Sequence, residues 1–330
     1  MMLTAPDALF QSGLNRQIVR MRQQLDRSSI EMVTGRTQDP LRAVRGNNDV
    51  LLRARAAIDA AEPERARLNV LEGRYRTAGS ALKTIRELTG EAARSAQAAG
   101  DIAAGVDADR FAATEARSAL ASTFATLEAR FGGRSLFGGT LGTGRVLEDV
   151  TVLVSEIETA VSGLSRAQDV SDAIRDYFVQ GGDFETNIYR GGDPLPEPEL
   201  DNGRSVASLP SANDESLRTL YRGLAMVAVN QQVDVGQRAA FLREASELIE
   251  TAREALVADE ASIGLALNVI GAEQDRQEQL LFDAETTMEN LLGRDPFEAA
   301  SETQSLEARL QAAYTVTSRM AALRLTNFLR

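Results

Sequence analysis

Apolar residues recur at alternating spacings of four and three residues at both ends of this chain. The N-terminal stripe contains Leu14, Ile18, Met21, Leu25, Ser28 and Met32, and the C-terminal stripe contains Leu306, Leu310, Ala313, Thr317 and Met320. Such spacing places one narrow apolar stripe along one face of a helix. We therefore expect a long helix at each end, and an antiparallel coiled coil built from the two.

A predicted break separates each stripe from the rest of the chain. Gly35 favours the end of a helix, because glycine tolerates the left-handed conformation found there. The pairs Asp39-Pro40 and Asp295-Pro296 favour helix starts, because proline fits the first helical turn. The sequence thus predicts two terminal coiled-coil segments, at residues 1–39 and 295–330.

Longer helices are expected between these breaks. Residues 40–140 and 213–294 repeat apolar residues on one helical face, which is typical of a helical bundle. Pro63 should kink or restart its helix, since proline lacks a backbone N–H and clashes with the preceding turn. Gly236 and Gly264 are weaker points in the second stretch.

Residues 141–212 differ from both arms of the bundle. Four of the eight prolines lie in residues 194–210, and residues 187–190 and 205–208 are short strand candidates. We expect a small mixed α/β insertion domain here, within a chain that is mainly α. Residues 132–144 hold six glycines but lack the spacings of a phosphate loop or a nucleophile elbow, so they are interpreted as a tight turn leaving a helix.

Composition excludes most catalytic chemistry. The 330 residues contain no Cys and no His, which removes thiolate and imidazole ligands and the commonest general base. The acidic group of Asp193, Glu197, Glu199 and Asp201 lacks the spacing of a calcium loop and is interpreted as solvated surface. We expect no catalytic residue, no cofactor and no metal. An enzyme built on a carboxylate pair is the weakest alternative.

Charge and hydropathy argue against two classes of partner, nucleic acids and membranes. The formal net charge of −12 argues against a nucleic-acid partner. Fifteen acids against five arginines give residues 140–216 a local charge of −10. No apolar run approaches the roughly 20 residues that span a bilayer, so no membrane partner is expected. The first residues lack a basic start followed by an apolar core, so no cleaved signal peptide is expected.

The terminal stripes point to assembly. A lone helix of this length is marginal in water, and two narrow stripes that pair only with each other bury little apolar surface. Copies of the same chain are the simplest additional partners, although the stripes could also be ordinary bundle core. The assembly interface is predicted to contain Leu14, Ile18, Met21, Leu25, Met32, Leu306, Leu310, Ala313, Met320, Leu325 and Phe328.

Several short segments carry motifs that occur together and in order along the chain: Thr34–Arg36, Asp39–Val44, the helix with Arg110 and Glu115, Gly133–Thr140, Asp295–Ala300, Leu310–Tyr314 and Leu325–Leu329. Together they resemble the flagellin-like axial proteins of bacterial flagella, and most of all the hook–filament junction proteins among them. Gly133–Thr140 is similar to a segment that is typical of junction proteins and missing from flagellins. Gln38 and Ser135 depart from the family pattern.

The resemblance implies a structural component that joins the hook to the filament by helical stacking. Its implied partners are copies of itself, the first hook-associated protein, flagellin and a cytoplasmic export chaperone that holds the C-terminal segment. It also implies secretion through the flagellar type III apparatus without signal cleavage. Residues 1–36 and 297–330 would be largely disordered in the free monomer and would pair only between stacked neighbours, with the acidic insertion projecting outward. A flagellin is the nearest alternative, and a soluble coiled-coil binding module is a more distant one.

Overall fold

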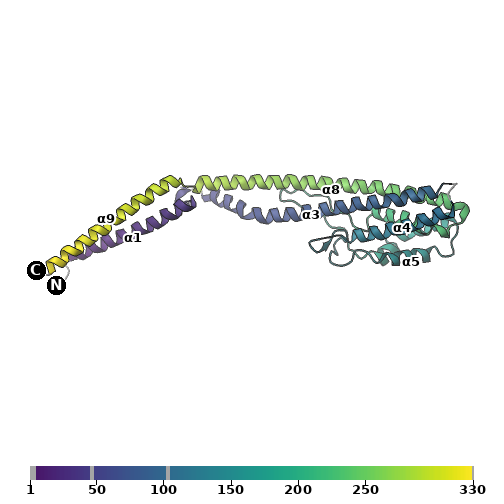
Figure 1. Ribbon diagram of the computed structural model, residues 1–330, viewed down its shortest axis with the longest axis horizontal. Coiled ribbons are helices and arrows are strands. Elements are labelled where there is room, and N and C mark those ends of the chain that lie inside the picture. The colour runs from purple at the N-terminus through teal and green to yellow at the C-terminus, as the bar shows by residue number, and fades with distance from the viewer. Residues whose placement is uncertain (1–4, 45–47, 102–104, 329–330) are drawn as a thin grey trace. The chain divides into compact units, whose positions relative to one another are not determined.

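The computed structural model describes residues 5–44, 48–101 and 105–328, and these residues are mainly helical, as the sequence predicts. Figure 1 shows the long helices and their order along the chain. The elements are α1 (Ala5–Thr34), α2 (Pro40–Ala43), α3 (Asn48–Ala99), α4 (Val106–Leu127), β1 (Arg130–Phe131), β2 (Arg134–Ser135), α5 (Val150–Ala160), α6 (Ala167–Phe178), the π-helical turn η1 (Phe184–Ile188), α7 (Glu215–Ala228), the 3-10 turn η2 (Asn230–Gln232), α8 (Val235–Leu292) and α9 (Pro296–Phe328).

The chain forms two compact units, and the long helices α3 and α8 contribute to both. The first unit comprises Met1–Glu64 with Gln277–Arg330, and the second comprises Arg65–Arg276. The sequence instead placed the boundaries after residue 39 and before residue 295. Residues 40–64 and 277–294 therefore belong with the chain ends rather than with the bundle.

In the first unit, α1 and α9 lie side by side and antiparallel, so that the first residues of α1 and the last residues of α9 are at the same end of the pair (Figure 1). Both helices have the boundaries that the breaks predict. Gly35 ends α1 with a φ of +64°, a conformation that a side chain would strain, and Pro296 is the first residue of α9. The pairing occurs within a single chain. Disorder of these segments in the free monomer stays a prediction.

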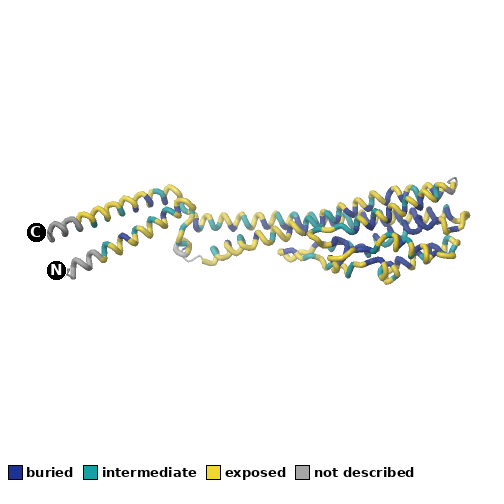
Figure 2. The backbone as a smooth tube through the Cα atoms, turned by 60° about the horizontal axis from the view of Figure 1, so that its bottom comes forward, coloured by how far each residue is buried: buried dark blue, intermediate teal, exposed yellow. Residues whose placement is uncertain are grey.

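The second unit has one continuous core formed by α3, α4, α5, α6, α7 and α8. Figure 2 shows most of the buried backbone in this unit, whereas the terminal helices are largely exposed. Four aromatic rings meet at its centre. Tyr221 packs against Phe124, Phe178 and Phe184, with ring centroids 5.2 to 6.3 Å apart. Burial of such large apolar side chains is the main stabilising term in a fold of this kind.

The expected strands within residues 141–212 are wrong for the described chain. This segment contains the helices α5 and α6 and the turn η1, and its pairing is limited to the bridges Leu147–Tyr189 and Glu199–Ser205. Four prolines between residues 194 and 210 explain the difference, because proline cannot donate a ladder hydrogen bond. Leu153, Ile174 and Phe184 belong to the same core as α3 and α7, so the segment packs into the bundle.

The glycine-rich run is a tight turn that follows a helix, as predicted. After α4, the strands β1 and β2 pair antiparallel across Gly132 and Gly133. Both glycines have positive φ, 58° and 79°, which suits a two-residue hairpin turn. The same run is tied to a distant loop, because Thr140 donates its backbone N–H to the carbonyl of Asp193 at 2.9 Å.

The helix α3 continues through Pro63, so the restart that the sequence allowed there is wrong. Proline removes one backbone hydrogen bond from the helix without ending it. In addition, α8 holds a window long and apolar enough to cross a membrane by length and composition alone, with a mean hydropathy of 1.4, and it was the one such helix found among the described residues. Asp259 and Glu260 interrupt that apolar stretch, so the sequence shows no unbroken run. Core helices of soluble proteins pass the same test.

Candidate assembly interface: the paired terminal helices

The predicted interface residues lie along the line where α1 meets α9, which we call the seam. Ile18 and Leu306 are buried, and Met32 is 36% exposed. Leu325 and Phe328 belong to α9, but their side chains lie outside the described residues. The other predicted positions are half-buried: Leu14, Met21, Leu25, Leu310, Ala313 and Met320. The structure thus brings most of the two stripes together within one chain.

Polar groups set the register of the seam near the predicted breaks. Ser28 is buried, and its Oγ donates to the carbonyl of Ala299 at 3.1 Å and lies 2.9 Å from the Thr303 Oγ1. Thr303 in turn donates to the Ala299 carbonyl at 2.8 Å. A buried polar pair in an otherwise apolar seam favours one register, because any slip leaves its atoms without partners.

The most buried charged side chain among the described residues of this unit, Glu31, lies outside the predicted stripe. Glu31, not Met32, continues the seam, and Glu31 is only 2% exposed. Its Oε1 accepts a hydrogen bond from the backbone N–H of Gln38 at 2.8 Å and one from the Thr37 hydroxyl at 3.3 Å. Its Oε2 pairs with the guanidinium of Arg294.

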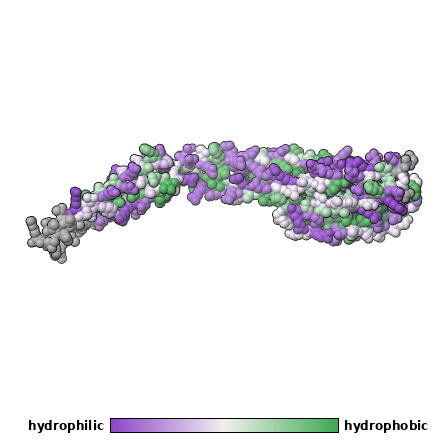
Figure 3. Space-filling view, viewed as in Figure 1, coloured by the Kyte–Doolittle hydropathy of each residue, from purple (hydrophilic) through white to green (hydrophobic). Residues whose placement is uncertain are grey.

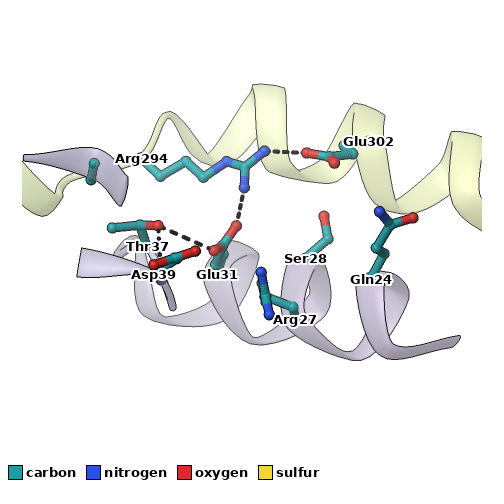
Figure 4. A pocket seen from close by; sticks show the side chains of 9 residues that line it. Gln24, Arg27, Ser28, Glu31, Thr37, Asp39, Arg294 and Glu302 are labelled. Atoms are coloured by element: carbon teal, nitrogen blue, oxygen red, sulfur yellow. Dashed lines mark hydrogen bonds and ion pairs between the residues drawn. The ribbon is translucent and has the colours of Figure 1, made fainter. Parts of the chain in front are cut away.

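Arg294 connects the two helices. Figure 4 shows its guanidinium between Glu31 of α1 and Glu302 of α9. Burial by itself lowers the pKa of Arg294, but the hydrogen bonds and charges of Glu302 and Glu31 more than offset this, and the net pKa is raised. A buried carboxylate that loses its cation is strongly destabilised, so this ion pair holds the end of α1 against the start of α9.

Backbone hydrogen bonds join the two breaks directly. Thr37 donates its N–H to the carbonyl of Leu292 at 2.8 Å, and Arg294 donates its N–H to the carbonyl of Gly35 at 2.9 Å. Arg36 and Gly293 form the antiparallel bridge between these bonds. The two breaks therefore form one structural element, although about 250 residues of sequence separate them.

A polar pocket of about 430 Å³ lies beside this element. The carboxylates of Glu31 and Glu302 and the guanidinium of Arg294 face it, and Arg27 lies at its edge (Figure 4). Its other lining residues are Gln24, Ser28, Thr37, Asp39 and Ala43. No group of three or more potential metal ligands was found among the described residues, and the charges here pair with one another, so the pocket has the character of a structural ion-pair network.

Large apolar side chains also point away from the seam. Val33 is 78% exposed and Phe297 is 83% exposed, and Val19, Ile30 and Val316 are each about half exposed. Figure 3 shows hydrophobic surface over the ends of α1 and α9 that adjoin the breaks. These residues fall outside the four-and-three spacing, so the sequence pattern did not single them out. Exposed apolar groups next to a thin seam provide further contact surface for a partner.

Shifted acids give no support to a catalytic carboxylate pair. Burial raises the pKa of Asp259, which accepts a hydrogen bond from the Ser216 hydroxyl at 2.8 Å. The pKa of Asp149 is instead lowered by hydrogen bonds from Thr151 at the start of α5. Acid–base catalysis by two carboxylates needs a second carboxyl group beside the first, whereas the hydrogen-bond partner of Asp259 is a serine hydroxyl.

Solved structures of known proteins include weak likenesses to this chain. No protein-family model matches the chain, and no curated protein matches its sequence. FlgL of Bacillus cereus is 14% identical, with a TM-score of 0.38, and the match covers 73% of this chain and 96% of that one. A suggested flagellar hook-associated protein of Vibrio parahaemolyticus is 12% identical, with a TM-score of 0.41, and the match covers 76% of this chain and 95% of that one. At these identities and TM-scores, neither likeness carries an argument about fold or function.

Proposed function

We propose that this protein is a non-catalytic structural subunit of the bacterial flagellum, which joins the hook to the flagellin filament by stacking through its paired terminal helices. The observation that carries the proposal is the thin seam between α1 and α9, which leaves apolar side chains such as Val33 and Phe297 uncovered. A two-helix unit with so little buried surface gains stability when other helices cover it. The motif resemblance gives the proposal its flagellar setting.

The same motif resemblance supplies the partners that we propose for this chain. Copies of the chain, the first hook-associated protein and flagellin would contact the terminal helices and the bundle wall. A cytoplasmic export chaperone would hold the C-terminal segment before secretion through the flagellar type III apparatus, without cleavage of a signal peptide. The absence of cysteine suits a chain that is exported unfolded, because no crosslink can form before threading.

A flagellin remains the second candidate. The segment Gly133–Thr140 favours the junction protein, since it resembles that group and flagellins lack it. Immunogold labelling of purified hook–basal bodies, with and without filaments, separates the two. Label restricted to the hook–filament boundary supports the junction protein, label along the filament supports a flagellin, and absence of label contradicts both.

The seam is tested by placing a charge in it. Leu25→Asp or Leu310→Asp would bury an unpaired carboxylate against apolar neighbours, and we expect loss of filament attachment. The exposed Gln23, on another face of α1, offers the matched control Gln23→Asp, which adds the same charge outside the seam. If Leu25→Asp and Leu310→Asp still support filaments, the seam is not the assembly interface.

A further inference from the structure

Helix α7 carries two arginines whose inward N–H groups lack acceptors. The Nε and Nη1 of Arg218 and the Nε of Arg222 are shut off from solvent and have no hydrogen-bond partner among the described residues. The two side chains lie one turn apart on the same helix face, because residues four apart are neighbours there. An unpaired buried N–H is costly, and most buried polar groups in proteins are paired.

These arginines line a pocket of about 270 Å³ between α6 and α7. Arg175 faces it from α6, and the walls are completed by Phe178, Val179, Gln180, Glu215 and Thr219. With three arginines and one glutamate, the lining has a net charge of 3 − 1 = +2. Arg218 and Arg222 directly follow residues 140–216, which have a local charge of −10.

The three guanidinium groups differ in how far nearby acids compensate their positive charge. Arg175 donates to Asp172 at 2.6 Å and to Asp176 at 3.3 Å, so its charge is already compensated. Burial lowers the pKa of Arg222, and the charge of Arg175 lowers it further, against the opposing influence of Glu244. Arginine remains charged in proteins, so the depressed pKa means that the positive charge of Arg222 is incompletely compensated.

We propose that the pocket between α6 and α7 binds a carboxylate group, which Arg218 and Arg222 hold through their guanidinium forks. Planar guanidiniums match the geometry of a carboxylate, and they bind it by two parallel hydrogen bonds. The acid Glu215 in the wall, and Asp172 and Asp176 beside Arg175, repel the two charges that sulfate concentrates on one group more than the single charge of one carboxylate group. Only one carboxylate of a dicarboxylate such as glutarate needs to enter the pocket, and the other can stay in solvent. The pocket therefore favours a carboxylate over phosphate or sulfate.

Two sources can supply this carboxylate: an acidic side chain of a neighbouring copy, or a free small carboxylic acid. The inference rests on the second unit alone and does not depend on the proposed flagellar function. The carboxylate site is tested with the full-length chain in dilute solution. Failure of that test would not contradict the flagellar proposal, and failure of the flagellar proposal would not contradict the carboxylate site.

The first measurement is the thermal midpoint of the full-length chain in glutarate, in sulfate and in sodium chloride at equal ionic strength. We expect glutarate to raise the midpoint by about 2–4 °C over sodium chloride at several times its dissociation constant. Arg218→Met should abolish this rise. Without glutarate, the same variant should unfold at the wild-type midpoint or above it, because it removes N–H groups that have no acceptor.

Arg166→Met is the matched control, since Arg166 lies on the exposed surface before α6 and the substitution removes the same charge. It should keep the response to glutarate, whereas Arg218→Lys, which keeps the charge but loses the fork, should lose most of it. An equal rise in sulfate and glutarate would indicate an adventitious ion only and overturn the proposal. So would a rise that persists in Arg218→Met.

The second measurement identifies the source. The Nε–H resonances of Arg218 and Arg222 are followed by NMR as the chain is concentrated without added acid, and then as glutarate is added to dilute chain. Shifts with protein concentration that Arg218→Met removes indicate a side chain of another copy. Shifts with glutarate alone indicate a free acid, and resonances that move in neither series exclude a carboxylate site.

Discussion

The two units of this protein bury their apolar residues in different ways. In the second unit, Tyr221 and Leu224 of α7 are fully buried, and helices pack around them on several sides. In the first unit, Ile18 and Leu306 are buried in a seam between only two helices, and much larger groups such as Phe297 stay exposed. We therefore predict that the second unit folds on its own core, whereas the first needs further surface to cover it.

Hydrogen exchange on the free chain would show the largest contrast between the units. We expect amides of α1 between Leu14 and Met32 to exchange close to unprotected rates, and amides of α7 around Leu224 to be slowed by about 10⁴-fold or more, as in a core of ordinary stability. Mass spectrometry of peptides from both helices measures this difference. Slow exchange across α1 in dilute buffer would show that the terminal helices are already folded and paired, and would contradict their assembly-dependent folding.

Truncation of a side chain in the core of the second unit should lower the free energy of unfolding of the free chain. Tyr221→Ala removes a fully buried ring and its hydrogen bond to the Ala212 carbonyl, at a cost of about 3–5 kcal/mol in the free energy of unfolding. Urea denaturation of the free chain measures the loss. Phe111→Ala is the control, because Phe111 is 64% exposed and its truncation should change stability little. Equal losses in the two variants would show that Tyr221 is no more important to stability than an exposed ring of the same unit.

The ion pair at the breaks should matter only when the terminal helices are folded. Glu31→Ala leaves Arg294 without its buried partner and the Gln38 N–H without an acceptor, a cost of about 3 kcal/mol. We expect unchanged urea denaturation of the free chain, but about 100-fold weaker addition of the purified protein to isolated hooks. Glu307→Ala removes an exposed acid from α9 and serves as the control. Addition to hooks at wild-type affinity would show that the pair is dispensable.

Titration of the second unit should give the smallest effect. The pKa of Asp259 is raised above 3.8 by burial, so folding favours its protonated form. The stability that this contributes is complete below the unfolded pKa and is lost as pH rises through the folded pKa. We therefore expect Asp259→Asn to be more stable than wild type at pH 7, with the difference shrinking as pH falls toward 3.8. Urea midpoints across this range measure it, and a difference that does not change with pH would contradict the titration.

Local sequence was sufficient for the helix boundaries but not for the contacts at their ends. Gly35 and Pro296 identify where α1 ends and α9 begins, because the left-handed glycine and the first-turn proline act within a few residues. The four-and-three spacing also identifies Ile18 and Leu306 as seam residues. It does not find Glu31, because a charged side chain interrupts the stripe and its partner Arg294 lies more than 260 residues away.

Residues 141–212 likewise have features that local sequence predicts and features that it does not. Composition marks residues 141–212 as irregular and acidic, but it suggests strands at residues 187–190 and 205–208, where the structure has isolated bridges at Tyr189 and Ser205. Short apolar runs there are compatible with either helix or strand, and packing against α4 and α7 decides between them. The arginine pocket was equally invisible, since Arg175 and Arg218 come together only when α6 docks on α7.

The sequence by itself determined the mainly helical class, the two breaks, the tight turn within residues 132–144 and the exclusion of cysteine and histidine chemistry. Each of these depends on intrinsic residue properties or on neighbours within a turn or two of the chain. The tertiary structure decided the pairing of Glu31 with Arg294, the packing of α5 and α6 into the core and the meeting of three arginines between α6 and α7. Those features join residues that are distant in sequence, and the energy of such contacts exists only once the helices have packed.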